Sequence, residues 1–518
     1  MGSIRTAILS VAGVVAISKI LGFLREVVIA DAFGTSAQYD LYLLAIILPA
    51  LLYGVLNFAA YYVFVPFLSR VMGEEADRGS PWPLMLLFLI GSFVLTAVIV
   101  AAAPWLTRIW TSGYTPQDAA LVVFYCRVTA AIIILGTTEA VMRATLHVRR
   151  IFAYPVTGYI IYNGFAILAV LLLADEMSVG AVALGLVGGL LLQNLFLIIR
   201  WFGLRPAQSN AAWFSPKNQR AMLAGAGVII LVELINRSYF MIDRYFAPTF
   251  GDGVVSALNY AQVLVALPDS IVGLAIASVV YPMFSDQRVR ADDETFIGLY
   301  SRAVLGGLFI AVPAALVMAI SATDITYLLF SRGQFDAESV VQTASVLRPL
   351  SLSVIALFVI SSSIRACYSR QKEAAVFLFT IVLFASKLFL TWWLQAVLSY
   401  PGIALATSLS QIMFAALMFA YILKMSNTRL TVPLLSTLGR MAVAGAAAAG
   451  AGWLAASYTD SAIAGGGHLY AAIRIICTTG AVATGFVIVV YIVGLGPLMQ
   501  RIVRDRHAGG LSGGTTSE

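Results

Sequence analysis

Residues 82–107 read WPLMLLFLIGSFVLTAVIVAAAPWLT and contain no charged side chain. A helix needs about 20 predominantly apolar residues to cross the hydrocarbon core of a bilayer, so this stretch predicts one membrane-spanning helix. The rest of the 518-residue chain has the same character, with 60% hydrophobic residues, 11% charged residues and a mean hydropathy of +0.92. A soluble domain cannot cover that much apolar surface. The sequence therefore predicts an all-α polytopic membrane protein.

By the same length criterion, the chain contains about fourteen expected transmembrane helices joined by short loops. The predicted spans are residues 7–30, 39–68, 82–107, 118–146, 154–174, 178–201, 219–248, 255–282, 297–320, 338–366, 373–397, 402–424, 436–458 and 469–497. Within 178–201, the pattern Gly185-x-x-x-Gly189 is typical of a face that packs against another helix.

A weak internal repeat relates the first two spans to the seventh and eighth: Arg25, Asp40 and Leu48-Pro49 recur as Arg244, Asn259 and Leu267-Pro268. Such repeats are the mark of many transporter folds. We therefore predict two pseudo-symmetric six-helix lobes around a central cavity, followed by two further helices. The expected parts are an N-lobe at 1–201, a cytoplasmic linker at 202–218, a C-lobe at 219–424, two helices within 425–497 and a cytoplasmic tail at 498–518.

Basic residues are concentrated in alternate loops and in both tails. Lys and Arg in short loops mark the cytoplasmic side, and with the N-terminus inside that side holds most of them, including Arg143, Arg149 and Arg200. The other side holds only Arg108, Arg244, Arg332 and Arg474. We expect an even number of helices, with both termini in the cytoplasm.

Several classes of function lack the residues that they need. The three histidines and three cysteines are far apart in the chain, so neither a metal centre nor a catalytic triad is expected. The net charge of +7 comes from short loops rather than from one basic face, so we expect no nucleic-acid partner. We predict a transporter that has no catalytic residues and no cofactor.

Charged side chains inside the predicted spans cost about 2.5–3.5 kcal/mol each on insertion scales, so each one indicates a function or a buried partner. Residues 7–30 contain Lys19, Arg25 and Glu26 within two turns of an otherwise apolar helix. In the seventh span Glu233 and Arg237 have i, i+4 spacing and are followed by Asp243 and Arg244, which leaves two readings open, an internal salt bridge or a substrate or cation site. Lys387 and Arg302 are expected near span ends, where long side chains reach the headgroups.

The motifs Ser18-Lys19-x-Leu21-Gly22-Phe23-x-Arg25-Glu26, Asp40, Leu48-Pro49-x-Leu51-Leu52 and Leu329-Phe330-x-Arg332-Gly333-x-Phe335-Asp336 follow one another along the chain. In this order they resemble the MurJ (MviN) family of lipid flippases, in the multidrug/oligosaccharidyl-lipid/polysaccharide exporter superfamily. The resemblance implies fourteen helices in two lobes that move undecaprenyl-pyrophosphate-linked sugars by alternating access. It also implies that Arg25, with Lys19 in the place of a usual arginine, contacts pyrophosphate. The chain departs at Tyr53-Gly54 and at Val263, where the family commonly has arginines.

We therefore expect a flippase that moves a lipid-linked saccharide, either lipid II for peptidoglycan or an exopolysaccharide repeat unit, to the outer leaflet of a bacterial inner membrane. The expected substrate contacts are Lys19, Arg25, Arg237 and Arg244, and the expected gating or coupling groups are Glu26, Asp40, Glu233 and Asp243. The membrane potential or an H⁺ or Na⁺ gradient is the expected driving force.

The expected partners are the lipid-linked substrate, membrane lipids and the machinery of cell-wall or polysaccharide synthesis. Two rival functions are a cation-coupled small-molecule or multidrug antiporter of the same superfamily and a membrane glycosyltransferase or polymerase. The second rival ranks lower, because no loop exceeds about 15 residues, which is short for an active-site domain.

Overall fold

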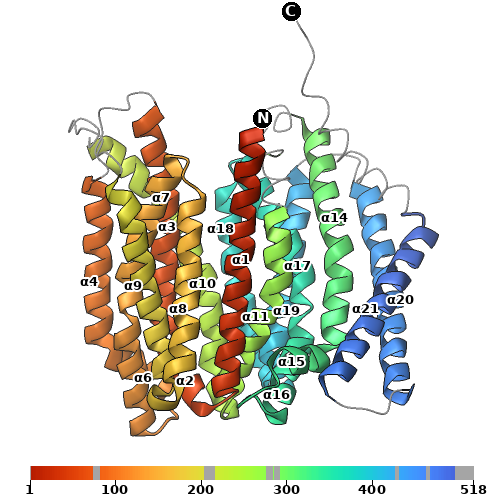
Figure 1. Ribbon diagram of the computed structural model, residues 1–518. Coiled ribbons are helices and arrows are strands. Elements are labelled where there is room, and N and C mark those ends of the chain that lie inside the picture. Colours follow the sequence, from red (N-terminus) through yellow and green to blue (C-terminus); the bar gives the residue numbers. More distant parts are fainter. Residues whose placement is uncertain are drawn as a thin grey trace, which may run out of the picture. The chain divides into compact units, whose positions relative to one another are not determined.

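The computed structural model of the chain describes residues 2–73, 82–203, 216–275, 284, 292–425, 431–462 and 467–495. Within these ranges every regular element is a helix, and long helices run side by side (Figure 1). The all-α prediction is confirmed. By their contacts the residues form two compact units: the first contains 1–257 and 332–339, and the second contains 258–331 and 340–518.

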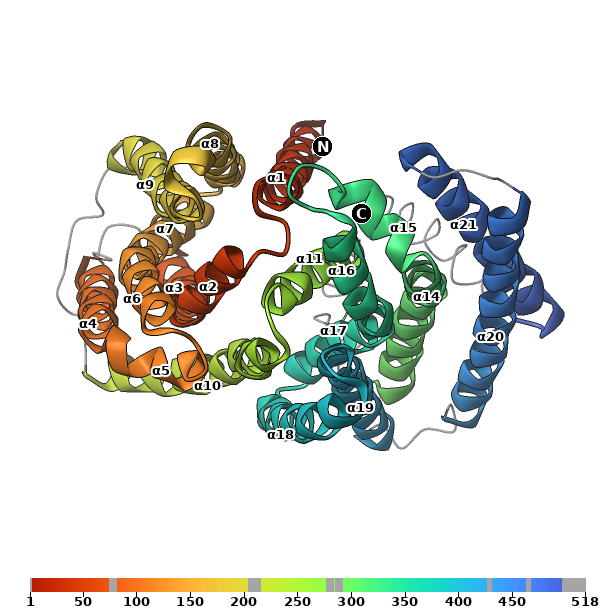
Figure 2. The same ribbon diagram turned by 90° about the horizontal axis from the view of Figure 1, so that it is seen from below.

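The first unit is a bundle built mainly from the N-terminal half of the chain. Its helices are α1 (Gly2–Phe33), α2 (Ala37–Ala45), α3 (Ile47–Gly73), α4 (Trp82–Leu106), α5 (Arg108–Thr111), α6 (Pro116–Thr129), α7 (Ala131–Val148), α8 (Ala153–Met177), α9 (Gly180–Phe202), α10 (Pro216–Phe246), the 3-10 turn η2 (Ala247–Phe250) and the first residues of α11 (Val254–Ala275). Helix α8 packs against α9 and α1, and α3 packs against α7 and α10 (Figure 2).

Glycines let α8 and α9 approach closely. A methyl group on Gly185 would lie 3.1 Å from the Cα atom of Ala166, and one on Gly189 would lie 2.8 Å from the carbonyl oxygen of Tyr162. Small residues at a helix interface allow backbones to come near enough for extensive van der Waals contact. The predicted packing role of Gly185 and Gly189 is therefore confirmed.

The second unit contains the rest of α11 from Leu258, followed by eight further described helices. They are α14 (Asp293–Ile320), α15 (Ala322–Phe330), α16 (Ala337–Leu350), α17 (Ser353–Ser369), α18 (Glu373–Leu398), α19 (Pro401–Met425), α20 (Thr431–Ala462) and α21 (His468–Ile492), and only the first residues of α16, up to Ser339, belong to the first unit. Helix α18 packs against α19, and α20 packs against α21. Arg474 lies inside α21 rather than in a loop, and it forms ion pairs with Asp324 of α15 and Asp460 of α20, so it ties these three helices together.

Nine described helices are long and apolar enough to cross a membrane, and the number rises to eleven if two bent pairs count as one span each. The chain bends by 42° between α2 and α3 and by 45° between α16 and α17. Pro49 follows the first bend and has no N–H to donate to the carbonyl of Ala45, the last residue of α2, and Pro349 stands beside the second bend. Because the search covers only the described residues, the count of fourteen is not confirmed.

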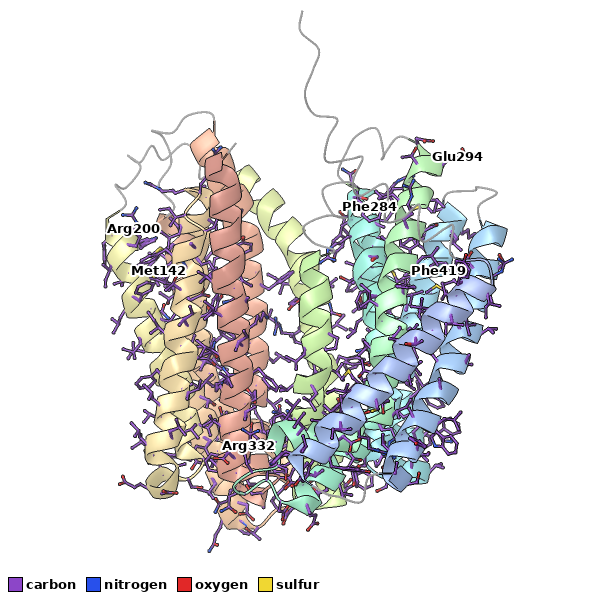
Figure 3. The ribbon with its side chains drawn as sticks, turned by 45° about the vertical axis from the view of Figure 1, so that its right-hand side comes forward. Met142, Arg200, Phe284, Glu294, Arg332 and Phe419 are labelled. Carbon is purple, nitrogen blue, oxygen red and sulfur yellow. The ribbon has the colours of Figure 1, made fainter. Side chains whose placement is uncertain are left out.

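The two ends of the first unit carry charges that the sequence assigned to opposite sides of the membrane. Arg200 of α9 and Arg332, in the segment that follows α15, lie at opposite ends of its helices (Figure 3). This separation is the one that the loop charges require. Which end faces the cytoplasm stays a prediction, as do the lobe, linker and tail boundaries drawn from the sequence.

Candidate functional site

Arg25 of α1 is held by a cluster of polar side chains inside the first unit. Its Nη2 atom lies 2.6 Å from Oε1 of Glu26, and Nη1 donates to the hydroxyl of Tyr162 at 3.0 Å and to Oδ1 of Asn163 at 3.1 Å. The guanidinium carbon also lies 5.4 Å from the centre of the Tyr162 ring. About a quarter of the Arg25 side chain is exposed, at 24%. Arg25 is therefore positioned by α8 and still reachable from outside.

Lys19 stands six residues before Arg25 on α1, and its side chain is exposed. The structure therefore brings Arg25 and Glu26 together and leaves Lys19 apart from their hydrogen bonds. The close approach of α1 and α8 is aided by Gly22, where a methyl group would contact the Asn163 amide at 3.8 Å. Tyr162 and Asn163 are site residues whose role the sequence analysis missed, because their partner lies on a helix far away in the chain.

Asp40 is 1% exposed and caps the first turn of α11. Its carboxylate accepts the backbone N–H groups of Gly253 and Ser256, each at 2.7 Å, as well as the Ser256 hydroxyl. Arg244 donates to the carbonyl oxygen of Val255 at 3.0 Å, so both residues bind the same turn. A carboxylate at a helix N-terminus satisfies orphan N–H groups and complements the helix dipole. Asp40 and Arg244 are therefore brought together around the start of α11.

The segment after α15 interlocks with the turn after α1 through two glycines. Gly34 and Gly333 have φ angles of +53° and +52°, and the Gln334 N–H donates to the carbonyl oxygen of Asp31 at 2.8 Å. A methyl group on Gly34 would collide with the carbonyl oxygen of Gln334, and one on Gly333 would collide with that of Asp31. Only glycine fits either position without strain, so the two turns seat against each other backbone to backbone.

Asp336 closes the same segment by binding the first turn of α16. Its Oδ1 atom accepts the backbone N–H of Ser339 at 2.8 Å, and this hydrogen bond lowers the pKa of Asp336 from its ordinary value of 3.8. Ser339 in turn shares a 2.9 Å hydrogen bond with the Thr35 hydroxyl. The ionised form of Asp336 is the one that this arrangement favours.

Glu233 and Arg237 form the ion pair that their spacing allows, with 2.7 Å between Oε1 and Nε. Arg237 is 42% exposed, and its guanidinium lies against Gly54 of α3, where a methyl group would collide with it. The neighbouring Tyr53 directs its ring onto Gly136 of α7. Gly54 is one of the three positions, with Tyr53 and Val263, at which the resemblance implies an arginine. The guanidinium of Arg237 therefore approaches α3 at a position where α3 carries no arginine of this kind.

Asp243 is buried, at 1% exposed, near the end of α10, and it precedes Arg244 directly. The structure thus brings together six of the eight predicted residues, as the pair Arg25 and Glu26 on α1, the pair Glu233 and Arg237 on α10, and Asp40 with Arg244 at the start of α11. Among the described residues, no three His, Cys, Asp or Glu side chains gather as a metal-ion site.

A buried network that the sequence analysis did not assemble joins α3, α7 and α8. Glu139 is 1% exposed and accepts Nε of Arg143 at 2.9 Å, Nδ2 of Asn57 at 3.0 Å and the Tyr159 hydroxyl at 3.2 Å. Nη2 of Arg143 also donates to Oδ1 of Asn57 at 2.9 Å. The expectation that Arg143 is a loop charge is wrong, because Arg143 lies inside α7. The i, i+4 spacing from Glu139 was the signal that could have revealed the pair.

The expectation that Lys387 reaches the headgroups from a span end is also wrong. Lys387 lies close to the middle of the 26-residue helix α18 and is 0% exposed. Its ammonium group donates to the carbonyl oxygen of Ile403 at 3.2 Å and to the Thr407 hydroxyl, both on α19. The physical reason is that α19 offers oxygen acceptors at the depth where the lysine stands, so its head can stay inside the bundle.

A sequence model of the family described as lipid II flippase MurJ matches residues 29–471. The chain belongs to the lipid II flippase MurJ family. It is 26% identical to the lipid II flippase MurJ of Burkholderia cenocepacia over an alignment of 381 residues, and this alignment covers 70% of this chain and 73% of the relative. It is 27% identical over 461 residues to the probable lipid II flippase MurJ of Rhizobium meliloti, covering 85% and 84%.

Solved structures support the same fold. A lipid II flippase MurJ in an inward closed conformation superposes with a TM-score of 0.77 at 19% identity, over 94% of this chain and 99% of that one. An inward-facing multidrug resistance MATE transporter of the MOP superfamily reaches 0.66 at 15% identity, over 79% and 94%. The likeness to MATE transporters is weaker than that to MurJ. Since the MurJ family is one of flippases, the prediction of a membrane transporter rather than an enzyme is confirmed.

Proposed function

We propose that this protein flips lipid II, the undecaprenyl-pyrophosphate-linked peptidoglycan precursor, from the inner to the outer leaflet of a bacterial inner membrane by alternating access. The family match and the names of the curated relatives support lipid II over an exopolysaccharide repeat unit. The chain crosses this membrane with both of its termini on the cytoplasmic side. Cell-wall synthesis enzymes deliver the substrate and take it up.

The orientation and partial exposure of the Arg25 guanidinium are the observation that supports the substrate assignment. A guanidinium presents a rigid fork of donors that matches phosphate oxygens, and this one is oriented by Glu26, Tyr162 and Asn163 while a quarter of its side chain stays exposed. Lys19, exposed on the same helix, adds a point charge for the approaching headgroup. Pyrophosphate binds here by replacing Glu26 as the partner of Arg25.

Arg237 and Arg244 are the second set of proposed contacts. The absence of a side chain at Gly54 gives the Arg237 guanidinium room beside α3, which supports a role for it in place of the family's arginines there. Glu233 keeps Arg237 neutralised until the substrate arrives. Asp243, which directly precedes Arg244 on α10, is the proposed counter-charge for Arg244.

Asp40 is the proposed gating group. It binds the first turn of α11, a helix that begins in the first unit and continues into the second from Leu258, so release of the carboxylate would free α11 at its start. We take the driving force to be the membrane potential or an H⁺ or Na⁺ gradient, with no cofactor.

The test is flipping of fluorescent lipid II in proteoliposomes made with purified protein. We expect Arg25→Ala to lose flipping by at least about tenfold, since a charge-assisted hydrogen bond contributes about 1.5–3 kcal/mol. Arg440→Ala is the matched control, because Arg440 is exposed and donates only to the carbonyl oxygen of Val493 among the contacts described for it. Wild-type protein that moves no lipid II, or Arg25→Ala protein that moves it at the control rate, would contradict the proposal.

A further inference from the structure

Lys387 is among the largest fully buried side chains in the described part of the chain. It belongs to the second unit, on α18, and none of the functional groups discussed above lies on that helix or on its neighbour α19. A lysine at mid-span costs insertion energy, so the fold must give its ammonium group something in return. What surrounds it is therefore informative.

The two contacts described for the ammonium group are with neutral oxygen atoms. The Ile403 carbonyl oxygen lies 3.2 Å from Nζ, and the Thr407 hydroxyl lies beside it one turn further along α19. The same hydroxyl is 3.2 Å from the Ile403 carbonyl, so these two oxygens form one small group facing α18. An ammonium group has three donors and no acceptor, and it acts on such oxygens as a compact positive charge.

More buried oxygen acceptors lie on the same two helices. Thr391 and Gln395 follow Lys387 at intervals of one turn on α18, and Gln411 follows Thr407 on α19. The Thr391 hydroxyl and the side-chain carbonyl oxygens of Gln395 and Gln411 are buried without a hydrogen-bond partner in the described residues. Hydroxyl and carbonyl oxygens are the ligands that hard cations prefer, and backbone carbonyls supply such sites in transporters.

We infer that Lys387 is a built-in cation: its ammonium group occupies, between α18 and α19, the place that an oxygen-coordinated alkali-metal ion would take if the lysine were absent. The Ile403 carbonyl and the Thr407 hydroxyl then need no soluble cation beside them. The consequence for energy coupling, which alone rests on the proposed function, is that Na⁺ binding at this position does not drive the cycle.

The first experiment compares thermal unfolding of the purified wild-type protein in equal concentrations of sodium, potassium and choline chloride. Choline is too large to enter a lysine-sized space, so it reports the effect of ionic strength alone. We expect the same Tm in all three salts. A Tm that sodium or potassium raises above the choline value by about 2 °C or more would overturn the proposal, because the oxygens would then already bind a soluble ion.

Two substitutions separate space from charge. Lys387→Ala leaves the oxygens and the room for an ion, so we expect its Tm to rise by about 2 °C or more from choline to sodium or potassium chloride. Lys387→Met removes the charge but fills the space with an apolar chain of similar length, so its Tm should be low and equal in every salt. Adding Thr407→Val to Lys387→Ala removes one oxygen ligand and should reduce the response.

The outcomes separate the two proposals. A Lys387→Ala protein without a cation response, or one that folds in no salt while Lys387→Met does fold, refutes the built-in cation. These readouts need no lipid II, so they stand whether or not the protein flips it. Conversely, wild-type flipping that is equal in sodium and choline buffers supports the inference, and flipping that requires sodium contradicts its consequence for coupling.

Discussion

Removing the Asp40 carboxylate is the sharpest test of how the start of α11 is held. The carboxylate is 1% exposed and accepts three hydrogen bonds, two from backbone N–H groups at 2.7 Å and one from the Ser256 hydroxyl. Asp40→Ala leaves all three donors buried without their acceptor. Hydrogen bonds to charged groups contribute about 1.5–3 kcal/mol each and are not additive, so we expect a loss of about 3–5 kcal/mol in unfolding free energy.

Two milder variants grade the effect. Asp40→Asn keeps the oxygen that serves Ser256 but turns a donor toward the Gly253 N–H, which should cost about 1–3 kcal/mol. Ser256→Ala removes only the hydroxyl bond and should cost about 1 kcal/mol. The predicted order of stability is wild type, Ser256→Ala, Asp40→Asn and Asp40→Ala.

The assay is unfolding of purified protein in mild detergent, followed by intrinsic fluorescence across a denaturant series, with lipid II flipping measured in parallel. If Asp40 is the gate, flipping should fall in the same order as stability. The reasoning is refuted if Asp40→Asn is as stable as wild type, or if Ser256→Ala costs as much as Asp40→Ala, because the carboxylate would then not be what holds the turn.

Three further outcomes follow from the other contacts. Glu139→Gln should destabilise by about 3–5 kcal/mol, because it leaves Arg143 buried without its carboxylate, and combining it with Arg143→Met should recover part of that loss in the same unfolding assay. Gly333→Ala should lower Tm more than Gly251→Ala, since a methyl group at Gly333 meets the Asp31 backbone whereas one at Gly251 meets nothing within 4 Å and both glycines have positive φ. The pKa of Asp336 is lowered in the folded protein, so the ionised carboxylate stabilises the fold above pH about 4. This stabilisation is lost as the pH falls through the pKa that Asp336 has in the folded protein. Asp336→Asn should therefore be less stable than wild type at neutral pH, and the two proteins should become equally stable in acid.

The sequence alone predicts those features that depend on neighbours in the chain. Long apolar stretches such as 82–107 reveal helices because a bilayer requires them, and α4 spans Trp82–Leu106 as expected. The i, i+4 spacing of Glu233 and Arg237 reveals an ion pair because helix geometry alone brings the two side chains together.

Contacts between distant helices are beyond such reasoning. Asp40 meets Gly253 and Ser256 only because α2 and the start of α11 lie together in the fold, more than 200 residues apart in sequence. Lys387 was expected to reach a headgroup because the sequence does not show that the oxygen acceptors it contacts lie on the next helix, α19. For buried charges the missing information is the partner, and the partner depends on packing that no local pattern encodes.

The ion pairs at the proposed substrate contacts bear on selectivity. Arg25 and Arg237 each lie 2.6–2.7 Å from a glutamate next to them or one turn away, so neither offers an uncompensated charge to the surrounding membrane. A phospholipid headgroup with a single phosphate must displace a carboxylate of equal charge and gains little by doing so. A pyrophosphate carries more charge and more acceptor oxygens, so it can engage both the fork of Arg25 and its neighbours at once. Pairing each arginine with an acid therefore makes the helix easier to insert and, by the same interaction, raises the charge that a ligand must carry in order to bind.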